Sequence, residues 1–278
     1  MSVTVMLGGN VDAIGPAIET AIHLTQKLKS TLTGLCVMPD PASSVVYVTG
    51  AETVIMGSAA IQSLTEAQDR MVSDFKQKFD AETGNAGSWL KAEFRKEVGS
   101  MASHGAAAAC LADAIVLPKD ATESGHALNA VFEHVLMEAR LPLVLAAEQV
   151  NTSDTCLIAW DGSPLTARTV RLHMPLIRSY KKVVIAHNEA KLRHRWSHVC
   201  QTSTDRLIAY LQEERLEVSL VNIEGPVSSG IMTASKAHDA ALIVMGAYGH
   251  NRIGQLLFGG TTSRVLHDAA APALALCH

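Results

Sequence analysis

The residues most able to do chemistry lie between positions 245 and 266, directly after the apolar run Ala241–Met245. Glycines there remove side chains where the backbone could close on a ligand, and free N–H groups at the start of a predicted helix attract an anion. The residues of this segment that we assign to a candidate site are Met245, Gly246, Gly249, Gly259, Gly260, Thr261 and Thr262. Because the pattern Gly-x2-Gly-x9-Gly follows a predicted buried strand, it is more specific than a lone GxxG. It predicts a phosphate site and therefore nucleotide binding.

Two further polar residues follow predicted strands of the same half. Asp161 comes after the strand Cys156–Trp160, and Asn188 comes after the strand Val183–His187. In an open parallel sheet, ligands bind in the crevice outside the carboxyl ends of the strands, so these residues should converge with the glycine loop. An alternative stays open at each place. Asp161-Gly-Ser-Pro also fits a turn and a helix N-cap, and the glycines also fit loop positions of positive φ.

The elements that position these residues occur twice along the chain. Each half opens with a strand, a helix and a second strand, and each ends with an apolar strand, a loop, a helix and a last strand. The opening elements are predicted over Val3–Leu7, Ala13–Lys29 and Leu32–Met38, then over Cys156–Trp160, Pro164–Ser179 and Val183–His187. The agreement in order and spacing indicates an internal duplication.

Strands that alternate with helices require right-handed crossovers and a parallel sheet. The predicted fold class is therefore α/β, with two tandem, open, mostly parallel five-stranded sheets flanked by helices, in the Rossmann-like manner. The polar stretch Glu148–Asp154 marks the boundary, which predicts domains over 1–149 and 152–278. Within the first, Ala42–Ser63 is predicted as a mobile loop and Gln62–Phe79 as an amphipathic helix.

Composition excludes several classes of protein. With 48% hydrophobic but only 4% aromatic residues, aliphatic side chains must fill the cores. A net charge of −4 without a basic block argues against nucleic acid as a partner. No apolar run approaches the roughly 20 residues that span a bilayer, and the N-terminus has no signal-like charged region, so we expect a cytoplasmic protein that does not enter membranes. The five cysteines form no CxxC pair, and Cys110, Cys156 and Cys277 are predicted as small core residues.

The second half resembles the universal stress protein family, and the duplication resembles the tandem-domain members of that family. The resemblance rests on Ala159-Trp-Asp161-Gly-Ser, on Met245-Gly-x2-Gly249-x9-Gly259 and on the final strand Ala271–Leu276. It implies that Asp161 lies near the adenosine of ATP, that backbone near Asn188 contacts adenine, and that the glycines with Thr261 and Thr262 cradle ribose and phosphates. The family usually has Ser or Thr directly after the third glycine, whereas this chain has Gly260.

The first half departs further from that pattern. Gly8-Gly9-Asn10 stands where Asp161 would be, and the loop 118–129 has no Gly-x2-Gly. Asp120 and Glu123 place carboxylates where phosphates would require donors. We therefore expect a degenerate first half and one nucleotide site per chain. In the alternative, Lys119 and the two glycines form an altered site.

Other chemistry has little support in the sequence. No nucleophile–base pair and no metal-ligand set stand out, and His194 and His198 are predicted to lie on a solvated helix face. His250 and Arg252 lie within the glycine loop, where they are either phosphate donors or exposed loop residues. No catalytic residue is therefore predicted.

The expected function is a cytoplasmic stress-response switch whose second domain binds ATP or another adenine nucleotide and acts on an unidentified protein partner. The resemblance also implies that the halves pack as an intramolecular pseudo-dimer through their last strands, and a homodimer is a further possibility. Two alternatives remain. One is a slow ATP hydrolase in which Asp161 helps to hold Mg²⁺, and the other is a nucleotide-free scaffold or ligand sensor.

Overall fold

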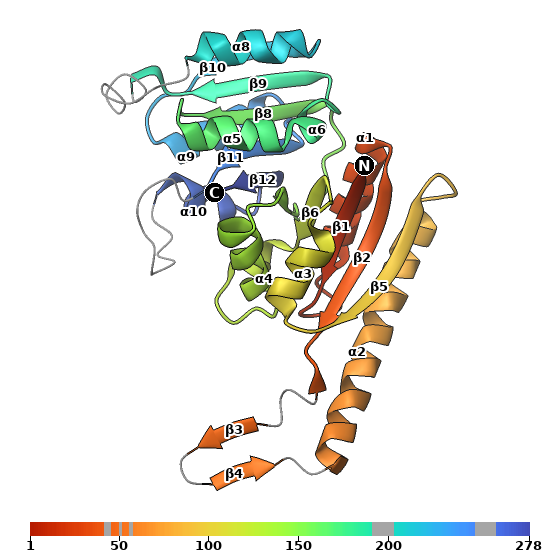
Figure 1. The fold of residues 1–278 in the computed structure, drawn as a ribbon. Coiled ribbons are helices and arrows are strands. Elements are labelled where there is room, and N and C mark those ends of the chain that lie inside the picture. The colour runs from red at the N-terminus through yellow and green to blue at the C-terminus, as the bar shows by residue number, and fades with distance from the viewer. Residues whose placement is uncertain (42–45, 50–51, 56–57, 191–202, 248–259) are drawn as a thin grey trace.

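The protein is described by a computed structural model that covers residues 1–41, 46–49, 52–55, 58–190, 203–247 and 260–278. Ten strands form one sheet in the order β10-β9-β8-β11-β12-β7-β6-β1-β2-β5. Figure 1 shows the arrangement of these strands and of the helices around them. Helices cover both faces, and this explains why the inner strands are uninterrupted apolar runs. The α/β class with mostly parallel strands, predicted from the alternation of elements, is confirmed.

The first half supplies five strands of this sheet, β7, β6, β1, β2 and β5, together with a separate hairpin. Its elements are β1 Ser2–Leu7, α1 Gly15–Leu28, β2 Thr31–Met38, β3 Val46–Thr49, β4 Glu52–Ile55, α2 Ser58–Asn85, β5 Lys91–Val98, α3 Met101–Ala109, β6 Ala114–Leu117, the 3-10 turn η2 Lys119–Thr122, α4 Asn129–Glu133, the π-helical turn η3 His134–Glu138 and β7 Leu143–Leu145. In this half β1 is central and pairs in parallel with β2 and β6.

The second half repeats this plan without the hairpin. Its elements are β8 Thr155–Trp160, α5 Pro164–Leu172, α6 Met174–Ile177, β9 Lys182–His187, α8 Thr204–Glu213, β10 Glu217–Asn222, α9 Val227–Ala237, β11 Leu242–Gly246, α10 Thr261–Leu266 and β12 Ala273–Cys277. Here β8 is central and pairs in parallel with β9 and β11.

The halves join edge to edge through their last strands. β7 and β12 are antiparallel, with Val144 opposite Ala275, and this is the one antiparallel pairing among the described strands of the large sheet. One buried apolar cluster on each face of the sheet runs across this junction. The two halves therefore share both cores.

Three local predictions are wrong. The predicted loop Ala42–Ser63 contains the hairpin of β3 and β4 and the start of α2, which extends the predicted helix Gln62–Phe79 at both ends. The predicted helix Pro164–Ser179 is two helices, because Pro175 lacks an N–H and falls in the first turn of α6. Cys110, predicted to be buried, is exposed at the end of α3.

Cys156 and Cys277 lie in buried strands, as predicted. Among the described helices, none combines the length and apolar character that crossing a membrane requires.

Candidate functional site

The candidate site lies where the central strands of the second half end. Ala159 in β8 is in register with Ala186 in β9 and with Met245 in β11. Because these strands are parallel, their carboxyl ends lie side by side, and Asp161, Asn188 and Gly246 all lie at these ends. The topology thus brings together the strand-end residues that the sequence singles out.

A tight turn positions Asp161. The backbone N–H of Ser163 donates to Asp161 Oδ1 at 2.9 Å, and Thr166 Oγ1 donates to the same oxygen. Ser163 is the N-cap of α5, and its Oγ accepts from the N–H of Thr166 at 3.1 Å. Gly162 takes a φ of 73° in this turn, where a glycine is favoured. The turn and N-cap interpretation of this motif is therefore correct, and the carboxylate is held at the strand ends.

Close packing of α5 on β11 accounts for Gly246. A Cβ atom at this position would lie 3.1 Å from Leu165 Cγ and 3.6 Å from Thr166 Oγ1. The glycine therefore lets the first turn of α5 approach the end of the strand, which also places the Thr166 hydroxyl between Asp161 and Gly246. The sequence prediction missed Thr166. Its position could have indicated it, because Thr166 lies three residues after the N-cap Ser163. This first turn of α5 lies beside the carboxyl ends of the strands.

Backbone conformation explains why this chain has Gly260 where the family usually has Ser or Thr. This residue has φ 103° and ψ −151° and precedes the first turn of α10, a region that a β-branched Thr would enter only with strain. Thr261 and Thr262 open the helix and are partly buried. Gly249, Gly259, His250 and Arg252 lie outside the described residues, as do His194 and His198.

Further groups lie around the carboxyl ends of these strands. The sequence prediction did not assign them to the site. His278 follows β12, and its Nδ1 lies 3.2 Å from the carbonyl oxygen of Ala247. Arg168 on α5 donates to the carbonyl of His278 at 3.2 Å, which places a cation beside the edge. At the end of β9, burial lowers the pKa of His187, and the charge of Glu189 opposes that shift. The topology could have indicated His278, because it follows a parallel strand of the same sheet.

The matching turn of the first half is filled by protein side chains. Asn10 Oδ1 accepts from the N–H of Asp12 at 3.0 Å, so Asn10 forms the turn that Asp161 forms in the second half. A Cβ on Gly9 would lie 2.6 Å from His126 Nε2, and one on Gly8 would lie 2.8 Å from Leu128 Cδ2. These glycines therefore admit two side chains of the loop after β6.

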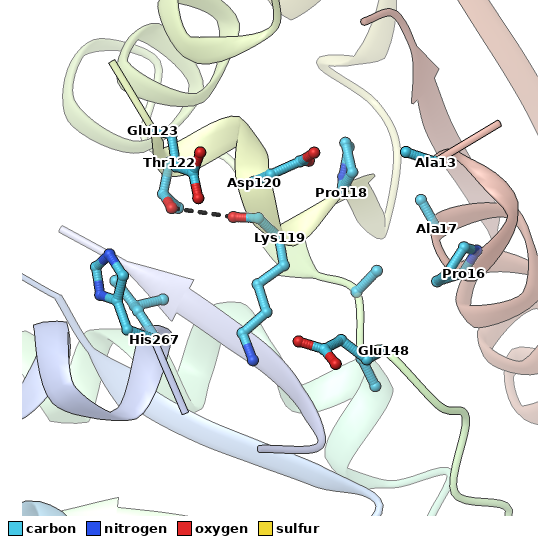
Figure 2. Close-up of a pocket in the computed structure, with 13 residues that line it drawn as sticks. Ala13, Pro16, Ala17, Pro118, Lys119, Asp120, Thr122, Glu123, Glu148 and His267 are labelled. Carbon is cyan, nitrogen blue, oxygen red and sulfur yellow. Dashed lines mark hydrogen bonds between the residues drawn. The ribbon is translucent and has the colours of Figure 1, made fainter. Parts of the chain in front are cut away.

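A cavity lined by described residues lies beside that turn and has a volume of about 290 Å³. Figure 2 shows its polar groups, which include the carboxylates of Asp120, Glu123 and Glu148. Lys119 Nζ donates to the carbonyl of Asp268, and burial lowers the pKa of Lys119 while Glu148 and Asp268 oppose the shift. A lining with three carboxylates and one ammonium that is already engaged by Asp268 is unfavourable for phosphates.

Comparison with known proteins places the match in the second half. The model of the universal stress protein family matches residues 178–276. A universal stress protein from Synechocystis sp. is 25% identical over 152 residues, which cover 54% of this chain and 51% of that protein. The chain thus spans about half the length of this relative.

Two solved structures resemble nearly the whole chain. A universal stress protein from Archaeoglobus fulgidus superposes with a TM-score of 0.66 at 16% identity, covering 99% of this chain and 95% of its own. A functionally unknown protein from Pseudomonas aeruginosa gives a TM-score of 0.51 at 14% identity, covering 99% and 92%. At these identities the likeness concerns the fold.

Proposed function

We propose that the chain is a member of the universal stress protein family and that residues 152–278 bind ATP or another adenine nucleotide. Family membership supports a role in the stress response. In the proposal, the first domain, residues 1–149, is a degenerate partner that binds no nucleotide, and the chain holds one nucleotide.

The observation that carries the proposal is that three polar groups converge at the carboxyl ends of the central strands of the second half. The Asp161 carboxylate, the Thr166 hydroxyl and the bare backbone of Gly246 meet where β8 and β11 end. Asp161 Oδ1 is used by the turn, and Oδ2 receives no hydrogen bond from the described residues. In the proposal Oδ2 accepts from the ribose hydroxyls, while the backbone after β9 near Asn188 contacts adenine and Thr261 and Thr262 contact the phosphates.

We propose that nucleotide occupancy biases a surface for a protein partner, which makes the domain a switch in the ensemble sense. Hydrolysis is expected to be slow, because no nucleophile–base pair stands out in the sequence. Mg²⁺ would accompany ATP as its counter-ion. We also propose a cytoplasmic location, the packing of the halves as a pseudo-dimer through β7 and β12, and a protein as the partner.

A nucleotide-free scaffold is the second candidate function. It is favoured because the fold alone accounts for three residues of the candidate site, without a ligand. Asp161 forms a turn, Gly246 allows close helix packing, and Gly260 has a positive φ.

Mass spectrometry of small molecules released from the freshly purified, denatured protein separates the two functions. Adenine nucleotide close to one per chain supports the switch, and its absence, together with failure to bind ATP at millimolar concentration, supports the scaffold. The Asp161→Asn variant is the matched control, because Asn keeps the turn, as Asn10 does in the first half, and removes the carboxylate.

A further inference from the structure

A second, much smaller cavity lies at the junction of the two halves. It is lined by α1, by residues 147–151 of the connection between the halves, by Tyr180 and by the residues that start β11 and β12. Its volume is about 10 Å³, which matches the space that a single water molecule requires. The cavity is therefore too small for any organic ligand.

Three of the six buried polar side-chain atoms that have no hydrogen-bond partner among the described residues belong to side chains lining this cavity. They are Thr20 Oγ1, His23 Nε2 and Tyr180 OH. Thr25, on the same helix, shows the usual solution for a buried threonine, since its hydroxyl donates to the Ala21 carbonyl at 2.7 Å. Buried polar groups are rarely left unsatisfied in folded proteins, so a cluster of three around one cavity requires an explanation.

We propose that this cavity binds one water molecule, which joins α1 of the first half to Tyr180 of the second. Buried waters typically make about three hydrogen bonds, the number of atoms available here. The water can donate to His23 Nε2, while the Thr20 and Tyr180 hydroxyls can each donate or accept. Every atom of the cluster then has a partner.

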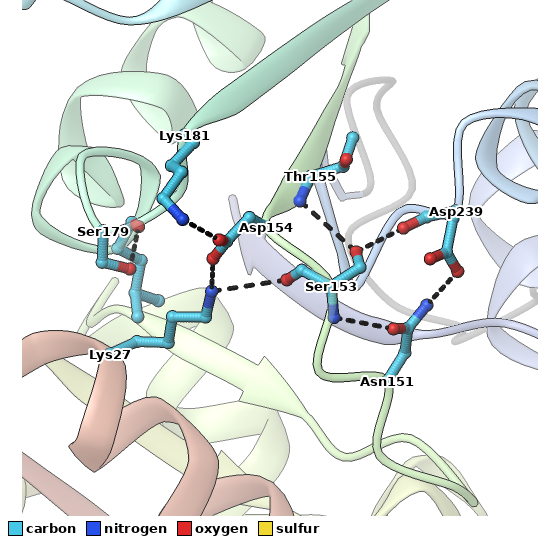
Figure 3. A network of polar contacts seen from close by, with 9 residues as sticks. Lys27, Asn151, Ser153, Asp154, Thr155, Ser179, Lys181 and Asp239 are labelled. Carbon is cyan, nitrogen blue, oxygen red and sulfur yellow. Dashed lines mark hydrogen bonds and ion pairs between the residues drawn. The ribbon is translucent and has the colours of Figure 1, made fainter.

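An ion pair between the two halves lies next to this cluster. Figure 3 shows Lys27, one turn further along α1 than His23, reaching Asp154 at the start of β8. The Lys27 ammonium also lies 4.7 Å from the centre of the Tyr180 ring. Burial lowers the pKa of His23, as does the neighbouring Lys27 charge, while Asp154 opposes the shift, so the imidazole is disposed to accept a hydrogen bond from water.

The sign of a stability change tests the proposal. If water bridges the cluster, Tyr180→Phe removes one of its hydrogen bonds and lowers the melting temperature by roughly 2–4 °C. If the cavity is dry, the same change removes a buried unsatisfied hydroxyl and raises the melting temperature. Tyr210→Phe, at a partly exposed position on α8, is the matched control and should change it little.

Two further measurements make the test decisive. The effect of Thr20→Val should depend on whether Tyr180 is intact, because one water serves both hydroxyls. A high-resolution crystal structure should show one ordered water within hydrogen-bond distance of Thr20 Oγ1, His23 Nε2 and Tyr180 OH. A dry cavity, or direct bonds between these side chains, would overturn the proposal. Neither result depends on nucleotide binding.

Discussion

The two halves use the same turn after their first strand and then diverge at the loop after their fourth strand in the large sheet. Asn10 and Asp161 each accept an N–H two residues later, at 3.0 and 2.9 Å. Opposite Asn10, the side chains of His126 and Leu128 pack over Gly8 and Gly9. Opposite Asp161, the strand β11 ends at Gly246, where a Cβ atom would lie 3.1 Å from Leu165 Cγ.

The comparison teaches that the two halves preserve the strands and the turn after the first strand, whereas the residues that pack beside that turn differ. Asn replaces Asp without loss of the turn, because both side chains offer an oxygen acceptor. In the first half, the side chains of His126 and Leu128 fill the space beside the turn. Four changes test how far this difference between the halves extends, and they are ordered by expected effect.

The largest expected effect concerns His173, where the second half breaks the helix that is continuous as α1 in the first. His173 is fully buried, Nε2 donates to the Leu276 carbonyl at 3.0 Å, and burial lowers the pKa of His173 to about 4. Between about pH 6.5 and 4 the unfolded chain binds a proton here that the folded chain does not, so stability falls as pH falls. The free-energy loss from this group is at most about 3 kcal/mol.

Denaturant unfolding at pH 7.5 and pH 4.5 measures this effect. His173→Gln retains an N–H donor for Leu276 but does not titrate, so the difference between the two pH values should shrink. An unchanged difference would mean that His173 does not limit acid stability. Burial also lowers the pKa values of His23 and His187, so part of the pH dependence should remain in the variant.

Gly246→Val should be the next most damaging change. Its Cβ would meet Leu165 Cγ at 3.1 Å, so α5 must shift, with a loss in unfolding free energy of about 1–3 kcal/mol. In the proposed function the same shift moves Asp161 and weakens ATP binding. Thermal unfolding and ATP titration check both effects. Pro118→Ala, at the corresponding position of the first half, should leave ATP affinity unchanged, and full affinity in the Gly246→Val variant would remove Gly246 from the site.

Asp161→Asn should separate the turn from the ligand. Stability should change by less than about 1 kcal/mol, because Asn still accepts from Ser163 and Thr166. ATP affinity should fall at least tenfold, since a hydrogen bond to a charged acceptor is lost. Asn10→Asp is the reciprocal control and should leave ATP affinity unchanged. Equal affinity of the wild type and Asp161→Asn would contradict the proposed role of the carboxylate.

The smallest expected effect is at the two ion pairs of Asp154, of which the pair with Lys27 joins the halves and the pair with Lys181 lies within the second half. Asp154 accepts from Lys181 and from Lys27, which together lower the pKa of Asp154 to about 2. Lys27 keeps only 13% of its side chain exposed, whereas Lys181 is 80% exposed. Lys27→Met should therefore cost about 1 kcal/mol in unfolding free energy, and Lys181→Met should cost less. Unfolding in denaturant measures both, and equal losses would show that Lys27 does not join the halves.

Most of the fold could be predicted from the sequence, because buried parallel strands are apolar throughout and alternate with helices at regular spacing. The segment 42–63 was misjudged because its small residues obscured the β-branched runs on either side of Gly50. The break at His173 depends on one proline near the end of an otherwise regular helical pattern. Cys110 was misjudged because an apolar sequence context does not reveal which side of a short helix faces solvent.

The candidate site was predictable only where topology determines it. Asp161, Asn188 and Gly246 follow parallel strands, so their convergence follows from strand order. Thr166 and the side chains that fill the first half depend on how helices and loops pack, which spacing alone does not specify. The glycine loop and its role remain predictions, because Gly249 and Gly259 lie outside the described residues.

Isothermal titration of the full chain with ATP and Mg²⁺ tests the central claim most directly. The account predicts saturable binding with a stoichiometry of one nucleotide per chain, weakened by Asp161→Asn and unaffected by Asn10→Asp. Two sites per chain would contradict the degenerate first half, and no heat of binding at millimolar ATP, confirmed by equilibrium dialysis, would contradict nucleotide binding altogether.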